Sequence, residues 1–323
     1  MFILLLQRSF HYSTTKTSTT VTSAAAFSVS QQTRFTTTFG ATVRGNIHNN
    51  NSKISHNMVK KKVFCFGDSL TAGTAPPSFQ EYPYAKHLES KLNELVQVQL
   101  EQQQQEIGVD AVPNPYMVRH YGLPGWTATQ LSSPEGNLNS ILERIKAQST
   151  KSAENTNDTT SNTRTDTNAD TGYPSLVIIL AGTNDLAYCT NETQCQSIFQ
   201  SIQSIHHLCH DKNIDTIALT IPSSAWQCQG NESGNNAAMY AKLINDKLES
   251  WATERQERDL VDSNIDGGGN TSSAVVHYVP FPIEAYDPSI GYWSSDGLHF
   301  SAEGYAFIGE SLAPIVKNIL ERQ

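Results

Sequence analysis

The first 57 residues of this chain contain no aspartate and no glutamate. They carry five basic residues and are crowded with Ser, Thr and Asn, a composition typical of a transit segment or of disorder. We predict a leader or disordered segment over residues 1–57 and one domain over residues 58–323. The compartment stays open, because the leader favours organelle import whereas a start at Met58 would favour the cytoplasm.

Long apolar runs and an excess of basic residues are also missing. The run Phe2–Leu6 is too short to span a bilayer, and no other run approaches the length of a transmembrane helix. The chain has 22 Lys and Arg against 31 Asp and Glu, and without the leader 17 against 31. An acidic domain argues against nucleic acid or an anionic membrane surface as partner. We therefore predict no nucleic-acid partner and no transmembrane segment.

Cysteine is scarce, with five in 323 residues and no C-x-x-C. This excludes a disulfide scaffold. Cys189 and Cys195 bracket a short loop, and we expect that they can pair in an oxidising compartment. Three histidines and one cysteine cluster over residues 206–210. Cys209 belongs to the apolar stripe of a predicted helix, so the histidines flank that stripe and are expected to face solvent. The sequence predicts no metal and no cofactor.

What the chain does have is a regular alternation of strand and helix patterns. Unbroken runs rich in Val, Ile and aromatics predict strands at residues 63–66, 117–121, 176–181, 216–221 and 275–281. Such runs indicate burial on both faces, as in a parallel sheet. Helical patterns separate the runs, over residues 83–98, 138–145, 195–210, 236–255 and 302–319. The alternation predicts a three-layer α/β/α fold around a flavodoxin-like, five-stranded parallel sheet.

Three segments are predicted to lie outside the core. Residues 149–171 are almost entirely Ser, Thr, Asn, Asp and Lys and have no large apolar side chain. Such a segment buries too little surface to offset the entropy of ordering it, so we predict a disordered insertion. A Gln/Glu tract at 99–106 and a glycine-rich loop at 262–273 are the other two.

The first strand ends in a turn that presents a serine, Gly67-Asp68-Ser69-Leu70. In an open α/β sheet a nucleophile sits beyond the carboxyl end of a strand. Much later, Asp296-Gly297-Leu298-His299 supplies a carboxylate and an imidazole three positions apart. A serine hydroxyl needs a base at neutral pH, so His299 is the candidate base and Asp296 the acid that fixes its tautomer. Either motif alone is as well explained by a surface turn or a helix cap.

Ester chemistry also needs hydrogen-bond donors for a developing oxyanion. The backbone N–H groups of Ser69 and Gly125 and the side-chain amide of Asn184 are the candidates, although Gly125 also suits a simple turn and Asn184 a helix cap. Asp68 and Asp185 are interpreted as structural acids that hold loops through backbone hydrogen bonds. For Asp185 a helix N-cap is the alternative.

Four blocks of the chain resemble, in family order, those of the SGNH hydrolases, also called the GDSL esterase/lipase family. The blocks are Gly67–Leu70, Gly125, Gly182–Asp185 and Asp296–His299, and the resemblance covers residues 60–320. It implies a serine esterase that acts on small esters with a short acyl or acetyl group through an acyl-enzyme.

The resemblance further implies that Ser69, Asp296 and His299 are catalytic and that Ser69, Gly125 and Asn184 form the oxyanion hole. Two alternatives stay open: an acyltransferase with the same residues, and a non-catalytic module that uses the first turn as an anion nest. No oligomeric state is predicted. Loop aromatics are interpreted either as pocket walls or as packing for their own loops: Trp126, Trp226, Tyr286, Tyr292 and Trp293.

Overall fold

A five-stranded parallel sheet forms the centre of the computed structural model, which describes residues 61–107, 115–154, 172–265 and 274–323. The strands are β1 (Lys61–Gly67), β4 (Tyr116–Gly122), β5 (Leu176–Leu180), β6 (Asp215–Leu219) and β7 (Val276–Val279). They lie in the order β4-β1-β5-β6-β7, and every pairing is parallel. With strands counted along the chain this is the flavodoxin-like order, as predicted.

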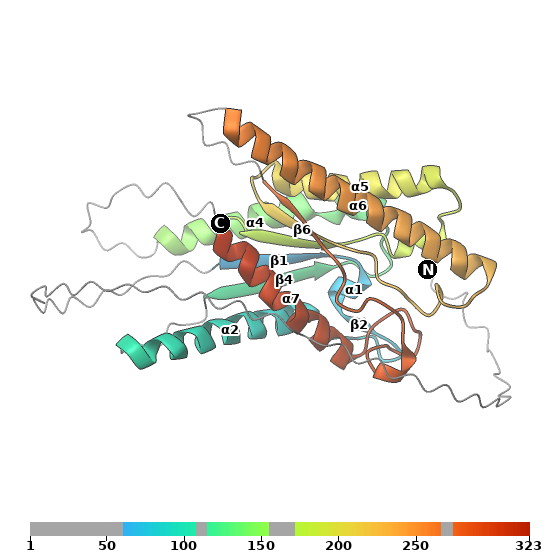
Figure 1. Cartoon of the computed structure of the whole chain (residues 1–323), viewed down its shortest axis with the longest axis horizontal. Helices are drawn as coiled ribbons and strands as arrows, with labels where there is room; N and C mark the ends of the chain where they lie inside the picture. Colours follow the sequence, from blue (N-terminus) through green and yellow to red (C-terminus); the bar gives the residue numbers. More distant parts are fainter. Residues whose placement is uncertain (1–60, 108–114, 155–171, 266–273) are drawn as a thin grey trace, which may run out of the picture. The chain divides into compact units, whose positions relative to one another are not determined.

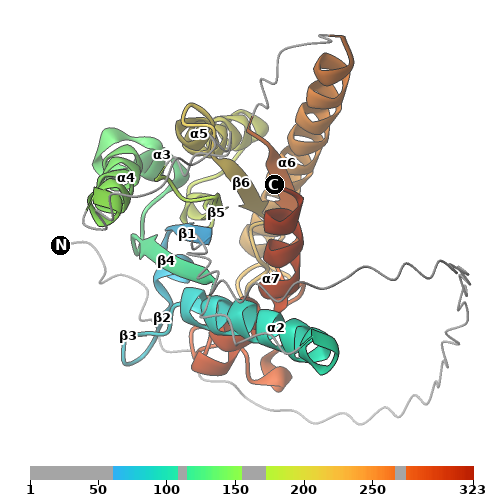
Figure 2. The same cartoon turned by 90° about the vertical axis from the view of Figure 1, so that its left-hand side faces the viewer.

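Helices cover both faces of the sheet. On one face lie α2 (Tyr84–Ile107) and α7 (Ala302–Arg322). In Figure 1, α2 appears below the sheet and α7 crosses in front of it. On the other face lie α3 (Ala128–Ser132), α4 (Leu138–Glu154), α5 (Glu192–His210) and α6 (Glu232–Ile265). Figure 2 shows the two layers on either side of the strands. The three-layer α/β/α fold is therefore confirmed.

Alternate side chains of each strand enter two separate apolar clusters. In β1, Val63 and Cys65 pack toward α2 and α7, whereas Phe64 and Phe66 pack toward the opposite helices. All five residues of β5 are buried. This two-sided burial explains why the strands are unbroken apolar runs rather than alternating ones.

Short elements fill the loops between the main ones. They are α1 (Ser69–Ala72), the hairpin β2 (Thr74–Ala75) and β3 (Gln80–Glu81), and the 3₁₀ helices η1 (Pro134–Gly136), η2 (Asn184–Ala187) and η3 (Pro288–Ile290). Because all five strands run the same way, the loops that leave them share one edge of the sheet, at the right in Figure 1. This carboxyl edge holds every candidate site residue.

Three helices run well past the ends that the apolar pattern predicts. Helix α2 continues through the Gln/Glu tract to Ile107, and α4 continues to Glu154, past the start of the predicted insertion. Helix α6 continues to Ile265, so the predicted loop at 262–273 begins in a helix, and residues 266–273 lie outside the described residues. Ser149 is anchored: its hydroxyl donates to the carbonyl of Ile145 at 3.0 Å and accepts from the Lys62 ammonium at 2.6 Å. The predicted leader and residues 155–171 lie outside the described residues.

The histidines at the end of α5 do not all face the same way: His207 is exposed, as predicted, whereas His206 faces inward. His206 has no exposed surface, so its predicted orientation toward solvent is wrong. Its Nδ1 lies 2.8 Å from the Thr216 hydroxyl, and Nε2 of His210 lies 2.9 Å from the same oxygen. Helix α5 packs against α6 as well as the sheet, and the ring of Trp251 on α6 lies 5.2 Å from that of His206. Burial lowers the pKa of His206 well below its ordinary value.

The described residues contain no group of three or more His, Cys, Asp or Glu placed to hold a metal ion. Cys189 and Cys195 are free thiols whose sulfur atoms lie 3.1 Å apart. Among the helices described here, none has both the length and the apolar character needed to cross a bilayer.

Candidate active site

Ser69 begins α1 directly after β1. Asp68 caps this helix, because its Oδ1 accepts a hydrogen bond from the N–H of Leu70 at 2.9 Å. The cap turns the chain out of the strand, so the serine lies at the carboxyl edge, where its side chain is largely buried. Strand β1 is also where the strand order reverses, with β4 on one side and β5 on the other. Ligands of open α/β sheets bind at such switch points.

The loop after β7 brings an imidazole and a carboxylate to this serine. Nε2 of His299 lies 2.9 Å from Oγ of Ser69, and Nδ1 lies 2.7 Å from Oδ2 of Asp296. In this geometry Nδ1–H donates to the carboxylate, which leaves Nε2 to accept from the serine hydroxyl. Three side chains that span 230 positions of sequence thus form one hydrogen-bonded row.

The carboxylate of Asp296 is held by the same short loop that it orients. Its Oδ1 accepts from the backbone N–H groups of Leu298 and His299, both at 3.0 Å. Burial acts to raise the pKa of Asp296, but hydrogen bonds from the His299 ring and from the two N–H groups outweigh it, so the pKa lies below its ordinary value. Asp296 is therefore ionised at neutral pH and can stabilise a positive charge on the imidazole.

The side chain of Asn184 links the candidate oxyanion donors, because it contacts the residue after Gly125 and the residue before Ser69. The amide nitrogen of Asn184 donates to the carbonyl of Trp126, the residue after Gly125, at 2.9 Å. It also lies 3.5 Å from Oδ2 of Asp68, the residue before Ser69. The amide of Asn184 is thereby held between the serine turn and the glycine loop.

Gly125 has a backbone that suits close approach of a substrate. Its φ is +80°, and a Cβ added there would meet no atom within 4 Å. The positive φ favours glycine, and the empty space leaves room for a bound group next to the backbone. In the described chain no protein atom accepts the Gly125 N–H, so it is free to donate to a ligand.

Two buried carboxylates support these loops. Asp68 has no exposed surface, and Asp185 is 5 % exposed. Burial raises the pKa of Asp68 to about 7 and that of Asp185 to about 6. Each accepts a backbone hydrogen bond, as predicted: Asp68 from Leu70, and Asp185 from the N–H of Ala128 at 2.8 Å. Asp185 does not cap its own helix but the start of α3.

The link between Asp68 and Asn184 is the feature that sequence analysis missed. The sequence did hold a partial signal for this contact, because Asp68 follows β1 and Asn184 follows β5, and the carboxyl ends of parallel strands lie at the same edge of the sheet. That β1 and β5 are neighbours is known only from the strand order.

The loop aromatics divide into two groups. Tyr292 stacks on Phe307, with ring centroids 4.7 Å apart, and Trp293 lies tilted against Phe300 at 4.5 Å, so both pack on the core. Tyr286 instead lies beside the triad loop, since a Cβ on Gly297 would come within 3.3 Å of its ring. Trp126 and Trp226 are partly buried against the core and partly accessible.

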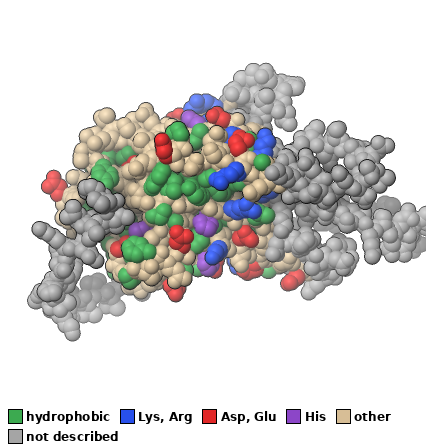
Figure 3. Space-filling view, turned by 180° about the vertical axis from the view of Figure 1, so that it is seen from behind, with side chains coloured by type: hydrophobic (Ala, Val, Ile, Leu, Met, Phe, Trp, Pro, Cys, Tyr) green, Lys and Arg blue, Asp and Glu red, His purple; other side chains and the backbone are tan. Residues whose placement is uncertain are grey.

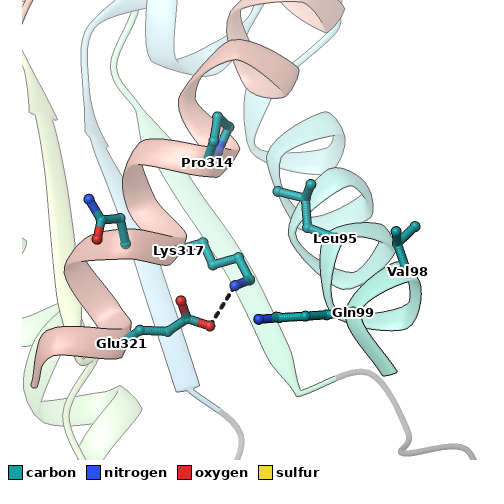
Figure 4. Close-up of a pocket in the computed structure, with 7 residues that line it drawn as sticks. Leu95, Val98, Gln99, Pro314, Lys317 and Glu321 are labelled. Carbon is teal, nitrogen blue, oxygen red and sulfur yellow. Dashed lines mark hydrogen bonds and ion pairs between the residues drawn. The ribbon is translucent and has the colours of Figure 1, made fainter. Parts of the chain in front are cut away.

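A groove of about 370 Å³ lies elsewhere, between α2 and α7. Figure 4 shows Leu95, Val98 and Gln99 on one wall and Pro314, Lys317 and Glu321 on the other. Both walls come from the ends of helices that lead away from the carboxyl edge. The groove is therefore not part of the serine site.

A serine, an imidazole and a carboxylate thus lie in a hydrogen-bonded row at the carboxyl edge of a doubly wound sheet. The chain belongs to the GDSL-like Lipase/Acylhydrolase family, whose model matches residues 65–307. It is accordingly a carboxylic ester hydrolase.

The solved structures with a similar fold are only distantly related to this chain in sequence. A carbohydrate esterase family 3 from Talaromyces cellulolyticus is 14% identical, with 81% of this chain and 99% of that chain covered and a TM-score of 0.46. A carbohydrate acetylesterase family member from Sinorhizobium meliloti is 16% identical, with 81% and 99% covered and a TM-score of 0.42. These likenesses carry no argument about substrate. A comparison with curated proteins found no match.

Proposed function

We propose that this protein is a serine esterase in which Ser69 is the nucleophile, His299 the general base and Asp296 the acid that orients it. The observation that carries the proposal is the row of hydrogen bonds from Ser69 Oγ to His299 Nε2 and from His299 Nδ1 to Asp296 Oδ2, at 2.9 and 2.7 Å. These distances lie within the range that proton transfer between nucleophile and base requires.

The reaction follows from these positions. Oγ of Ser69 attacks the ester carbonyl while Nε2 of His299 takes the hydroxyl proton, which it then gives to the alcohol as the C–O bond breaks. The acyl-enzyme is cleaved when water attacks the same carbon and loses a proton to Nε2. Ser69 is thereby restored and the carboxylic acid is released.

The tetrahedral intermediates carry an oxyanion. The backbone N–H groups of Ser69 and Gly125 are proposed as two donors, supported by the positive φ and the empty space at Gly125. The amide of Asn184 is proposed as the third, through the N–H whose contact with Oδ2 of Asp68 is long, at 3.5 Å, and which turns to the oxyanion when it forms. Each donor of this kind typically lowers the barrier by about 3 kcal/mol.

The proposed substrates are small esters with a short acyl or acetyl group, an expectation that rests on the family. A panel of p-nitrophenyl esters of graded acyl length tests it, because the preferred length appears directly as the highest kcat/KM. Repeating the assay with an added alcohol distinguishes hydrolysis from acyl transfer, in which the ester of that alcohol accumulates.

The mechanism is tested by Ser69→Ala. We expect kcat/KM to fall by about 10³-fold or more with the fold retained, because only binding and oxyanion stabilisation remain. Ser295→Ala, an exposed serine next to Asp296, is the matched control and keeps its activity. A folded Ser69→Ala protein with near-normal turnover would disprove the mechanism.

A further inference from the structure

The loops at the carboxyl edge of the sheet carry charge of one sign only. They span residues 68–83, 123–137, 181–191, 220–231 and 280–301, all within the described part of the chain. None of them contains Lys or Arg. Exposed carboxylates occur in these loops or on the first residue of the helix that follows: Glu81, Glu135, Glu192, Glu232 and Glu284.

Basic residues gather toward the opposite edge. Helices of a doubly wound fold run back from the carboxyl to the amino edge, so basic residues near helix ends lie far from Ser69. Lys61 begins β1 and bonds the carbonyl of Leu320 at the end of α7, and Arg255 reaches the carbonyl of Ala274 just before β7. Figure 3, seen from behind, shows Lys and Arg in the middle and right of the view and none among the coloured atoms at its left end, where the carboxyl edge lies.

Two cations lie close to these loops along the chain. Lys86 lies in the first turn of α2, at the carboxyl edge, beside His120 on the outer strand β4, where the loop carboxylate Glu81 also acts. Lys242 on α6 is paired with Asp246 at 2.6 Å. The five loops themselves therefore carry carboxylates and no Lys or Arg, and Lys86 is the cation that faces them from the outer strand.

Aromatic rings at the same edge favour the same kind of ligand. Tyr286 lies against the loop that carries Asp296 and His299, and Trp126 and Trp226 are partly accessible on neighbouring loops. Tyr188, which follows η2, is 73% exposed. Ring faces attract cations and pack against uncharged groups.

We propose that the site selects its esters by charge, accepting those with a cationic or uncharged alcohol moiety and rejecting those with a carboxylate, sulfonate or phosphate beside the scissile bond. The proposal rests on the proposed esterase function, since it concerns the same serine. Sites lined by one sign of charge concentrate ligands of the opposite sign and repel their own. The carboxylate product is repelled by the same field, which favours its release.

Three matched acetates test the proposal on the full chain. Acetylcholine is cationic, 3,3-dimethylbutyl acetate is its uncharged isostere, and 2-acetoxyethanesulfonate is anionic. We expect kcat/KM to fall in that order, with a cation-to-anion ratio of about 10 or more at low ionic strength. The ratio should shrink toward one in about 1 M salt, where the screening length is only about 3 Å.

Charge-reversal variants locate the effect. Glu284→Lys, in the loop after β7, should lower the cation-to-anion ratio by about threefold or more and leave the uncharged ester unaffected. Glu257→Lys, an exposed residue near the far end of α6, is the matched control and should not change the ratio.

The two proposals fail in distinguishable ways. If the uncharged ester is hydrolysed through Ser69 but the charged esters react equally well, or the anionic one better, charge selection is overturned and the esterase function stands. A ratio that changes equally in both Lys variants also overturns it, because the effect then belongs to net charge rather than to this edge. If no ester in either panel is hydrolysed, both proposals fall.

Discussion

Among single residues, Asp68 has the most unusual environment. It is fully buried beside the candidate nucleophile, and each of its carboxylate oxygens has a separate contact. Oδ1 accepts from Leu70 and keeps α1 in place, whereas Oδ2 faces the amide of Asn184. The acid thus connects the serine turn to the third proposed oxyanion donor.

We expect Asp68→Asn to lower kcat by about tenfold or more while KM changes little, since it would place an amide N–H opposite the N–H of Asn184 and misalign that donor. Asp287→Asn, in the loop after β7, is the control. Unchanged kcat in Asp68→Asn would show that Asn184 is oriented without this contact.

The same substitution changes how stability depends on pH. Burial raises the pKa of Asp68 to about 7 from an ordinary value of 3.8, so the folded protein binds this proton more tightly than the unfolded chain. The contribution of Asp68 to unfolding free energy therefore falls as pH rises from about 4 to about 7. Urea titrations across this range should show a shallower fall for Asp68→Asn.

At the scale of elements, the site depends on how closely β4 approaches α1. A Cβ on Gly122, the last residue of β4, would lie 2.2 Å from the backbone nitrogen of Ala72 and 2.6 Å from the carbonyl oxygen of Asp68. Both atoms belong to the backbone, so no side chain can move aside. This contact sets where the serine turn lies relative to the neighbouring strand.

Gly122→Ala should therefore cost about 3 kcal/mol of unfolding free energy and reduce activity, because α1 must shift to admit the methyl group. Gly230→Ala is the matched control: its φ is +70° but its surroundings are empty, so it should cost only about 1 kcal/mol and leave kcat intact. Equal losses of unfolding free energy in the two variants would mean that α1 moves away from β4 at little energetic cost.

At the scale of the whole molecule, the family match spans residues 65–307, within the predicted domain of residues 58–323. Residues 1–57 and 155–171 lie outside the described residues. Ser149, in contrast, bridges α4, Lys62 and the carbonyl of Gly172. The limit of the dispensable insertion is therefore expected after α4 rather than at residue 149.

A chain that starts at Met58, with residues 155–171 replaced by a short Gly/Ser linker, should keep its kcat and its unfolding midpoint. A second chain that also lacks residues 149–154 should unfold at a lower urea concentration, because the hydrogen bonds of Ser149 are lost. Loss of activity in the first chain would show that the leader or the insertion packs on the domain.

Local pattern alone determined much of this protein. Unbroken apolar runs predicted the five strands, because burial on both faces requires apolar residues at every position. Adjacency along the chain was also enough to pair Asp296 with His299, since residues three apart share a turn. The sequence likewise singled out Ser69, because a glycine turn after a buried strand exposes the next side chain at the sheet edge.

Tertiary structure decided those features that depend on which helices and strands lie next to each other. The inward orientation of His206 follows from α6 packing over α5, and the contact between Asp68 and Asn184, 116 positions apart, follows from β5 lying beside β1. That the five loops without Lys or Arg share one edge likewise requires all five strands to be parallel. A hydrophobic pattern specifies which face of a helix or strand is buried, but not which other element covers that face. The orientation of His206, the contact between Asp68 and Asn184 and the shared loop edge all depend on which elements become neighbours.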